Sequence, residues 1–114
     1  MLAAGASRRF GVRNKLLLEI DGKAMARRTA ERLLAVGVGR LVVTLGHEAE
    51  EVAKVFSGLG AELVVNPNFE YGMGTSVVAG MNRLAELEVS GALLCVADLP
   101  RLRTESVAAV CRRF

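Results

Sequence analysis

Short, almost unbroken apolar runs alternate along this chain with longer stretches in which apolar and polar residues mix. Three of the runs, 40–45, 61–65 and 92–96, are rich in Val and Leu. Runs of this length and composition predict strands buried on both faces, as in a parallel sheet covered by helices. A fourth apolar piece, 1–4, precedes the first glycine and predicts a further, short strand.

Between and after these runs, apolar residues recur every three or four positions, the spacing of one helix face. The segments with this spacing are 24–36, 48–56, 75–87 and 104–112. In the third segment we expect one buried side formed by Val77, Val78, Met81, Leu84 and Ala85. Strands that alternate with helices predict βαβ crossovers, and therefore an α/β fold with a parallel sheet.

Two further segments carry turn signals. The stretch 16–20 ends at Asp21-Gly22, which predicts a short extended piece closed by a turn. Asn66-Pro67-Asn68, followed by Gly72 and Gly74, predicts an irregular segment that lines a site.

Composition limits the class of protein. With 114 residues, 52% hydrophobic and 24% charged, the chain is expected to form a single globular domain over 1–114. No apolar run approaches the roughly 20 residues that span a bilayer, and Arg8 and Arg9 arrive too early for a cleavable leader. We therefore expect a cytoplasmic protein without a membrane partner. Cys95 and Cys111 match no metal or disulfide spacing, which predicts buried, reduced thiols.

The charge is unevenly distributed. Nine of the fifteen basic residues lie in 8–40, against three acidic residues in the same range. This asymmetry favours an anionic ligand near the N-terminal half. Aromatic residues that could stack on bases are few, and no recognition motif accompanies the charge, so nucleic acid is not the expected partner.

The strongest candidate for binding such a ligand is the loop 5–11. It contains two glycines, Ser7 and Arg9, and Lys15 follows shortly after it. Backbone N–H groups freed by glycine, beside fixed positive charge, suit a triphosphate. The loop matches neither the P-loop nor the dinucleotide pattern. From the residues alone it is either a phosphate-binding loop or an ordinary turn with exposed arginine.

Three other positions have two readings each. Asp98 directly follows a predicted strand, so it is either a magnesium ligand at the sheet edge or a helix cap. The segment 72–76 contacts a base or ribose, or it is a plain cap through Thr75 or Ser76. His47, the single histidine, is followed by acidic residues and fits a surface position at a helix start better than a catalytic base.

Taken together, three motifs resemble a known family. They are Leu2-Ala3-Ala4-Gly5-x-Ser7-x-Arg9-Phe10-Gly11-x-x-Asn14-Lys15-Leu16-Leu17, then Asn66-Pro67 with Gly72-Met73-Gly74-Thr75-Ser76, then Ala97-Asp98-Leu99-Pro100. The set resembles the MobA-like nucleotidyltransferases and is most similar to the molybdenum cofactor cytidylyltransferases. The guanylyltransferase branch typically carries Leu-Ala-Gly-Gly, so Ala4 favours CTP or a related cytidylyl or adenylyl donor.

The resemblance implies a three-layer Rossmann-like fold, of the nucleotide-diphospho-sugar transferase type, with strand order 3-2-1-4. It implies transfer of CMP from CTP to a phosphate-bearing acceptor, molybdopterin, with release of pyrophosphate. Arg9, Lys15 and Asp98 would be the catalytic residues, and Asp98 would bind Mg²⁺. The nucleotide would be held by Leu2, Ala3, Ala4, Gly5, Ser7, Arg9, Lys15, Gly74 and Ser76.

Family members extend beyond this chain, so we expect a partial NTP-transferase domain, shortened at both ends. Two alternatives remain for its activity. One is a nucleotidyltransferase for a sugar phosphate or another small phosphate, and the other is an inactive nucleotide-binding fragment. A second copy of the chain is a further candidate partner, because the short sheet would have an exposed edge.

Overall fold

A parallel sheet lies at the centre of the molecule. The structure, a computed structural model, describes residues 1–5, 15–37, 39–99 and 101–113. The sheet contains β1 (Leu2–Ala3), β4 (Val42–Leu45) and β5 (Glu62–Val65) in the order β1-β4-β5. Leu2 lies opposite Thr44, and Val42 lies opposite Glu62, with all strands parallel.

The chain returns to the other side of β1 at Val96, which forms a parallel bridge with Leu2. The Leu2 N–H donates to the Cys95 carbonyl at 2.8 Å, and the Ala97 N–H donates to the Leu2 carbonyl at 2.9 Å. The predicted strand order 3-2-1-4 is thereby confirmed. The prediction of a full strand over 92–96 is wrong, because β1 offers only two residues of ladder to pair with.

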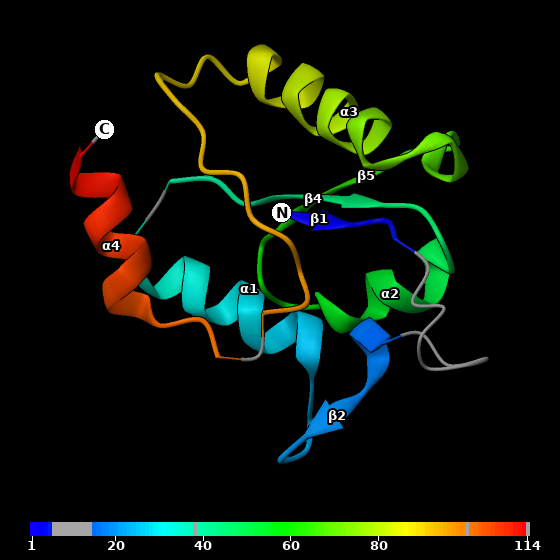
Figure 1. Cartoon of the computed structure of the whole chain (residues 1–114), viewed down its shortest axis with the longest axis horizontal. Helices are drawn as coiled ribbons and strands as arrows, with labels where there is room; N and C mark the ends of the chain where they lie inside the picture. The colour runs from blue at the N-terminus through cyan, green and yellow to red at the C-terminus, as the bar shows by residue number, and fades with distance from the viewer. Residues whose placement is uncertain (6–14, 38, 100, 114) are drawn as a thin grey trace.

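Helices cover both faces of the sheet, which confirms the three-layer α/β fold (Figure 1). On one face lie α1 (Met25–Ala35) and α2 (Ala49–Val55), and on the other lies α3 (Met73–Glu86). The last helix, α4 (Thr104–Arg113), packs beside α1. None of the described helices is long and apolar enough to cross a membrane.

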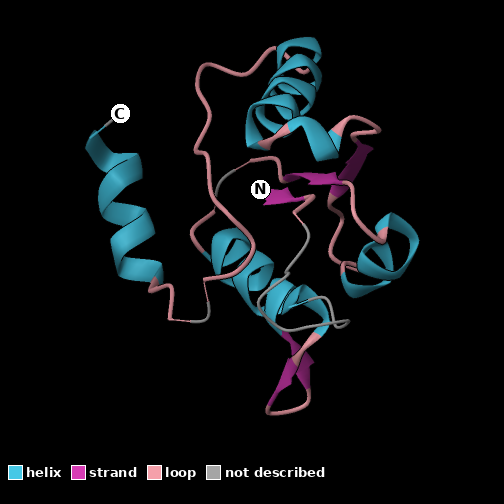
Figure 2. Cartoon of the chain, turned by 45° about the vertical axis from the view of Figure 1, so that its right-hand side comes forward, coloured by secondary structure: helices cyan, strands magenta, loops and turns pink. Residues whose placement is uncertain are grey.

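A small hairpin projects from the α1 side of the molecule (Figure 2). It consists of β2 (Glu19–Ile20) and β3 (Lys23–Ala24), paired antiparallel. The two turn residues, Asp21 and Gly22, have φ of 54° and 80°, the double positive φ of a type I′ turn. The predicted turn at Asp21-Gly22 is confirmed.

The core lies between the sheet and α1 and α2. The chain has few aromatic residues, and small side chains contribute to this core. The fully buried residues of the core include Leu45 and Val43 of β4, Ala26 and Ala30 of α1, and Val52 of α2.

Two expectations about buried faces are wrong. The strand β5 is an edge strand, and Leu63 and Val65 are exposed. On α3, the residues turned away from the sheet include Val78, Met81 and Ala85, which the pattern placed on the buried side. The face that approaches β4 contains Gly80, where a Cβ atom would lie 2.9 Å from Thr44 Oγ1. The close approach of α3 to β4 at Gly80 therefore sets the orientation of this helix, and its most hydrophobic face is not the one that meets the sheet.

Candidate functional site

The carboxyl ends of the parallel strands form one edge of the sheet, the usual place for a ligand in an open α/β sheet. β1 leads into Ala4 and Gly5, β4 into Gly46, and the bridge at Val96 into Asp98. Gly5 is exposed, and among the described residues no atom lies within 4 Å of the position that a Cβ would take there. Within the described part of the chain, no side chain therefore packs against the backbone at Gly5.

Two of the predicted catalytic side chains meet at this edge. Lys15 begins the 3₁₀ turn η2 (Lys15–Leu17), and its Nζ lies 3.4 Å from Asp98 Oδ2. The two side chains are 30% and 42% exposed, so both remain accessible to a ligand. A cation and a carboxylate side by side can contact a phosphate and a metal ion, respectively. Ser7 and Arg9 lie in 6–14, outside the described residues.

The backbone after β1 is joined to the turn after β4. The His47 N–H donates to the Ala4 carbonyl at 3.0 Å. Gly46 allows this approach, because a Cβ there would lie 2.8 Å from the Ala4 Cβ and 2.6 Å from the Phe69 Cβ. Leu2, Ala3 and Ala4 are thus buried and held in place by neighbouring segments, whereas Gly5 is exposed.

Asn66 joins the end of β5 to the start of α3. Its side chain is buried, and its amide nitrogen donates to Thr75 Oγ1 and Ser76 Oγ, both at 2.9 Å. Its oxygen accepts from the Asn68 N–H at 2.9 Å. Every hydrogen-bonding position of the amide NH₂ is used, so this network fixes the first turn of α3 relative to the sheet.

The start of α3 bears on one of the two readings of 72–76, the plain cap. The residue in the cap position of α3 is Gly72, so Thr75 and Ser76 are not caps. Ser76 is buried and accepts a hydrogen bond from Asn66, whereas Gly74 is exposed in the first turn. If this segment contacts a ligand, the backbone at Gly74 is the accessible part and the Ser76 hydroxyl is not.

His47 lies just before α2 at the surface, as predicted, and is 39% exposed. Its Nε2 is 3.1 Å from Glu48 Oε1, and its ring lies 6.1 Å from that of Phe69, centroid to centroid. These contacts assign it to the surface near the helix start.

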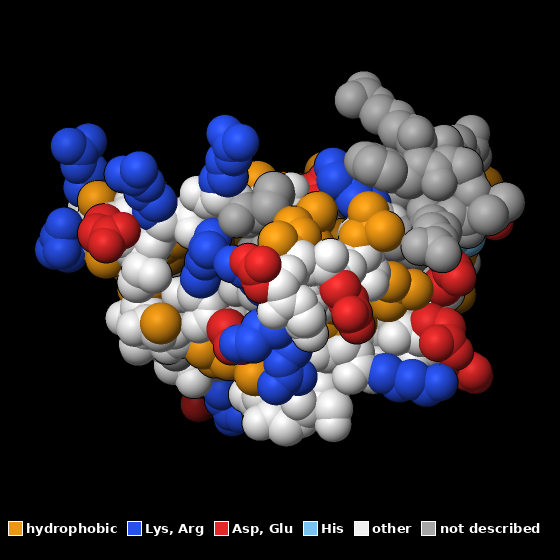
Figure 3. Space-filling model, turned by 90° about the horizontal axis from the view of Figure 1, so that it is seen from below, with side chains coloured by type: hydrophobic (Ala, Val, Ile, Leu, Met, Phe, Trp, Pro, Cys, Tyr) orange, Lys and Arg blue, Asp and Glu red, His pale blue; other side chains and the backbone are white. Residues whose placement is uncertain are grey.

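Several arginines of the basic N-terminal half bind the protein itself. Arg27 Nη1 donates to the carbonyls of Val55 and Ser57, at 2.9 and 2.8 Å. Arg28 Nη1 donates to the Ile20 carbonyl, and Arg32 Nη1 donates to the Leu102 carbonyl. The face that carries α1, α2 and α4 shows basic side chains interspersed with acidic ones (Figure 3). Part of the basic excess is therefore structural and does not serve an anionic ligand.

Asp98 is the predicted magnesium ligand. Among the described residues, no group of three or more His, Cys, Asp and Glu is placed to bind a metal ion. Mg²⁺ on a nucleotide commonly takes only one or two carboxylates, with phosphates and water completing its shell. A single accessible carboxylate beside Lys15 fits that kind of site and not an all-protein metal cage.

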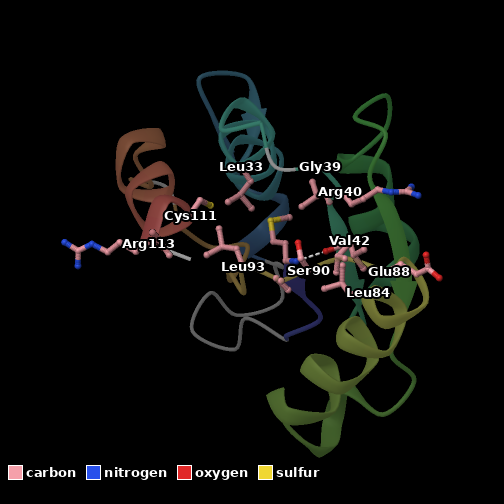
Figure 4. A pocket seen from close by; sticks show the side chains of 16 residues that line it. Leu33, Gly39, Arg40, Val42, Leu84, Glu88, Ser90, Leu93, Cys111 and Arg113 are labelled. Carbon is pink, nitrogen blue, oxygen red and sulfur yellow. Dashed lines mark hydrogen bonds between the residues drawn. The ribbon is translucent and has the colours of Figure 1, made fainter.

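A separate groove of about 650 Å³ lies at the opposite end of the sheet (Figure 4). It is bounded by the start of β4, the ends of α1, α3 and α4, and the segment 88–93, with Leu33, Val42, Leu84 and Leu93 among its lining residues. It includes neither Lys15 nor Asp98. This groove is therefore distinct from the candidate site.

Both cysteines are free thiols, and the prediction that they are buried is wrong, because each is only partly buried. Burial raises the pKa of the Cys95 thiol, and the nearby Asp98 carboxylate acts in the same direction, while the amino group of Met1 opposes them. The neutral thiol form is therefore favoured, which suits a packing role.

The fold defines an α/β domain with a parallel sheet between two layers of helices. The chain belongs to the MobA-like NTP transferase domain family, whose sequence profile matches residues 1–114.

Individual relatives agree with this membership. The chain is 41% identical over 91 residues to a bifunctional IPC transferase and DIPP synthase of Rubrobacter xylanophilus, covering 75% of this chain and 21% of that protein. It is 32% identical over 114 residues to a probable molybdenum cofactor guanylyltransferase of Pyrococcus horikoshii, covering 100% of this chain and 54% of that protein. A nucleotidyl transferase structure from Methanothermobacter thermautotroptrophicus shares the fold, with a TM-score of 0.80 and 24% identity, over 97% of this chain and 54% of that one. The chain thus spans from about a fifth to about half of these proteins.

The sequence motifs do not include Gly46, although a glycine directly after a buried strand is a signal that could have identified it. The role of Asn66 was visible only as part of a loop motif.

Proposed function

We propose that this domain is the nucleotide-binding part of a nucleotidyltransferase that transfers a nucleoside monophosphate to a phosphate-bearing acceptor. The observation that carries the proposal is the pair Lys15 and Asp98, which meet at the sheet edge where β1 ends at the exposed Gly5. Membership of the NTP transferase family supports the reaction class.

In the proposed reaction, a phosphate oxygen of the acceptor forms a bond to the α-phosphorus of the nucleotide. The bond to the bridging oxygen of the β-phosphate breaks, and pyrophosphate leaves with the electron pair. Lys15, and by resemblance Arg9, bind the triphosphate and neutralise charge, while the backbone of 2–5 positions it. Asp98 would hold Mg²⁺, which supplies further charge neutralisation on the phosphates. No protein nucleophile is needed.

We further propose CTP as the donor and a molybdopterin-type compound as the acceptor. Because CTP is a nucleotide of the cytoplasm, we propose that the protein acts there. Ala4 supports CTP through the resemblance of its motif to the cytidylyl branch. The name of the Pyrococcus relative makes GTP the competing donor. The different name of the Rubrobacter relative favours a second candidate, in which the acceptor is another small phosphate.

The test of the donor is calorimetric titration of CTP, GTP and ATP, each with and without Mg²⁺. We expect Mg²⁺-dependent binding of CTP that is tighter than binding of GTP. Lys15→Ala should weaken it by about 10–100-fold, because a charge-assisted contact to phosphate contributes about 1.5–3 kcal/mol. Lys54→Ala, which removes an exposed lysine paired with Glu51 on α2, should bind as the unsubstituted protein does. Failure of all three nucleotides to bind, or equal binding by Lys15→Ala, contradicts the proposal.

Turnover is tested by pyrophosphate release with a molybdopterin acceptor and, separately, with sugar phosphates. Release with the pterin alone supports the first candidate, and release with a sugar phosphate supports the second. Tight Mg²⁺–CTP binding with no release of pyrophosphate for any acceptor identifies a nucleotide-binding domain without activity of its own.

The variant Ala4→Gly tests the choice of donor, since we expect it to shift the binding preference from CTP toward GTP.

The exposed edge strand β5 supports a second copy of the chain as a partner. Leu63 and Val65 are 40% and 59% exposed there, and an unpaired edge can pair with another strand. Light scattering tests this proposal, and a mass of the monomer alone at high concentration contradicts it.

A further inference from the structure

Thr29 lies in the middle of α1 with no exposed surface, and its hydroxyl reaches another part of the chain. A threonine inside a helix commonly donates to the carbonyl four residues earlier. Here that carbonyl, of Met25, is 3.3 Å away, whereas the Ala97 carbonyl is 2.9 Å away. Because the hydroxyl has one proton, the shorter contact identifies Ala97 as its main acceptor.

Ala97 is the residue immediately before Asp98, and its backbone is held on two sides. Its carbonyl accepts from Thr29 of α1, and its N–H donates to the Leu2 carbonyl of β1 at 2.9 Å. Ala97 itself is 1% exposed. The position from which the Asp98 side chain projects is therefore fixed by a helix and a strand together.

The same helix holds the chain on the far side of Asp98. Arg32, one turn after Thr29, donates from Nη1 to the Leu102 carbonyl at 2.7 Å. A weaker contact of 3.5 Å joins the Thr29 hydroxyl to the Leu99 carbonyl. α1 thus contacts the segment before Asp98 and the segment after it, while Asp98 itself points toward Lys15, 3.4 Å away.

We propose that Thr29 is a positioning residue for the nucleotide site. Its hydroxyl fixes the Ala97 peptide unit so that the Asp98 carboxylate is held beside Lys15, where it can meet a metal-bound triphosphate. This inference rests on the proposed function of Asp98. Thr29 would thus contribute to binding of the Mg²⁺–nucleotide, although it is buried in a helix and lies far in sequence from the site motifs.

Three variants of the 114-residue chain test the proposal. Thr29→Val removes the hydroxyl and keeps the shape, and Thr29→Ser keeps the hydroxyl. Thr44→Val is the matched control, because Thr44 is equally buried in the sheet but lies on the side that faces α3. Each is titrated with CTP and with GTP, in the presence of Mg²⁺ and in its absence, and its thermal unfolding is recorded.

We expect Thr29→Val to weaken binding of the Mg²⁺–nucleotide by about tenfold, the scale of one lost buried hydrogen bond. Binding of the metal-free nucleotide should be unchanged, because it does not involve Asp98. Thr29→Ser should restore the Mg²⁺-dependent affinity. Equal losses for Thr29→Val and Thr44→Val, equal losses with and without Mg²⁺, or no recovery in Thr29→Ser would overturn the assignment.

A second measurement keeps this inference separate from the proposed function. Hydrogen exchange of the Ala97 amide, which is bonded to Leu2, reports on the segment without any nucleotide. We expect faster exchange in Thr29→Val than in Thr29→Ser or Thr44→Val. If the unsubstituted protein binds no nucleotide but this exchange pattern appears, the proposed function fails while the hydroxyl still positions the segment. Unchanged exchange in Thr29→Val overturns the positioning itself.

Discussion

At the scale of single residues, the site edge depends on side chains that are small or missing. The space beside Gly46 is filled by Ala4 and by the ring of Phe69, and this packing joins the end of β1 to the end of β4. A side chain at position 46 would have to displace both neighbours. The geometry of the loop after β1 is therefore linked to a glycine more than 40 residues away in the chain.

We predict that Gly46→Ala destabilises the fold by about 1–3 kcal/mol, the usual cost of inserting a methyl group into a packed site. Urea denaturation measures the change. The matched control is Gly39→Ala, because no atom of the described residues lies within 4 Å of a Cβ there and its φ is not in the left-handed region. That variant should unfold like the unsubstituted protein, and equal midpoints for the two variants would contradict the prediction.

The residues of the site were predictable to different degrees. Lys15 and Asp98 could be selected from the sequence, because a lysine after a glycine-containing loop and an aspartate at a strand end carry a chemical signal. Their approach to 3.4 Å could not, since it depends on how η2 and the Val96 bridge meet. Ser76 was selected for a ligand contact, but in the structure its hydroxyl is buried against Asn66.

At the scale of elements, sequence signals succeeded where one local cause dominates. The turn at Asp21-Gly22 was predictable, because few residue pairs adopt two positive φ values in succession. The face of α3 was not, since apolar residues surround most of that helix and the pattern could not show which of them meet the sheet. Gly80 and the Asn66 network decide the orientation, and both act through contacts with residues distant in the sequence.

The junction between the hairpin and α1 leads to a pH-dependent prediction. Glu31 of α1 lies 3.0 Å from Lys23 Nζ of β3 and 3.2 Å from Arg27 Nε. The hydrogen bond from Lys23, above all, lowers the pKa of Glu31 below its ordinary value of 4.5. A carboxyl whose pKa is lower in the folded state stabilises the fold at pH values above its unfolded pKa. That contribution is lost as the pH falls through the folded pKa.

Glu31→Gln should therefore be less stable than the unsubstituted protein at pH 7, and the difference should shrink toward zero as the pH falls below 4.5. Because the pair is solvent-exposed and screened, we expect a loss below about 1 kcal/mol at pH 7. Thermal unfolding between about pH 3 and pH 7 measures it. Glu70→Gln is the control, because it removes an exposed carboxylate of η3 (Phe69–Tyr71) that lies outside this cluster of charges. A difference that grows toward low pH would contradict the linkage.

At the scale of the whole molecule, the alternation of apolar runs with amphipathic segments was enough to predict a parallel α/β sheet. The strand order came from the resemblance to a family and is confirmed. The incomplete fourth strand could not be predicted, because a strand forms only where a neighbour offers backbone groups. β1 offers two residues, so 92–94 remain outside the ladder despite their strand-like composition. Composition indicates which segments are able to form a sheet, and pairing decides how much of each one does.

The site is assembled from segments at both ends of the chain, since Lys15 and Asp98 are 83 residues apart. A ligand that bridges them should therefore stabilise the whole domain and not one loop. At 100 times its dissociation constant, a ligand specific for the folded state contributes about 2.7 kcal/mol, which for a domain of this size raises Tm by about 10 °C. We predict such a rise for Mg²⁺–CTP in thermal unfolding. Lys15→Ala should show a much smaller rise at the same nucleotide concentration, and Lys54→Ala the full one. A rise that survives in Lys15→Ala would mean that the nucleotide binds elsewhere, because removal of one end of the bridge must remove most of the stabilisation that the bridge provides.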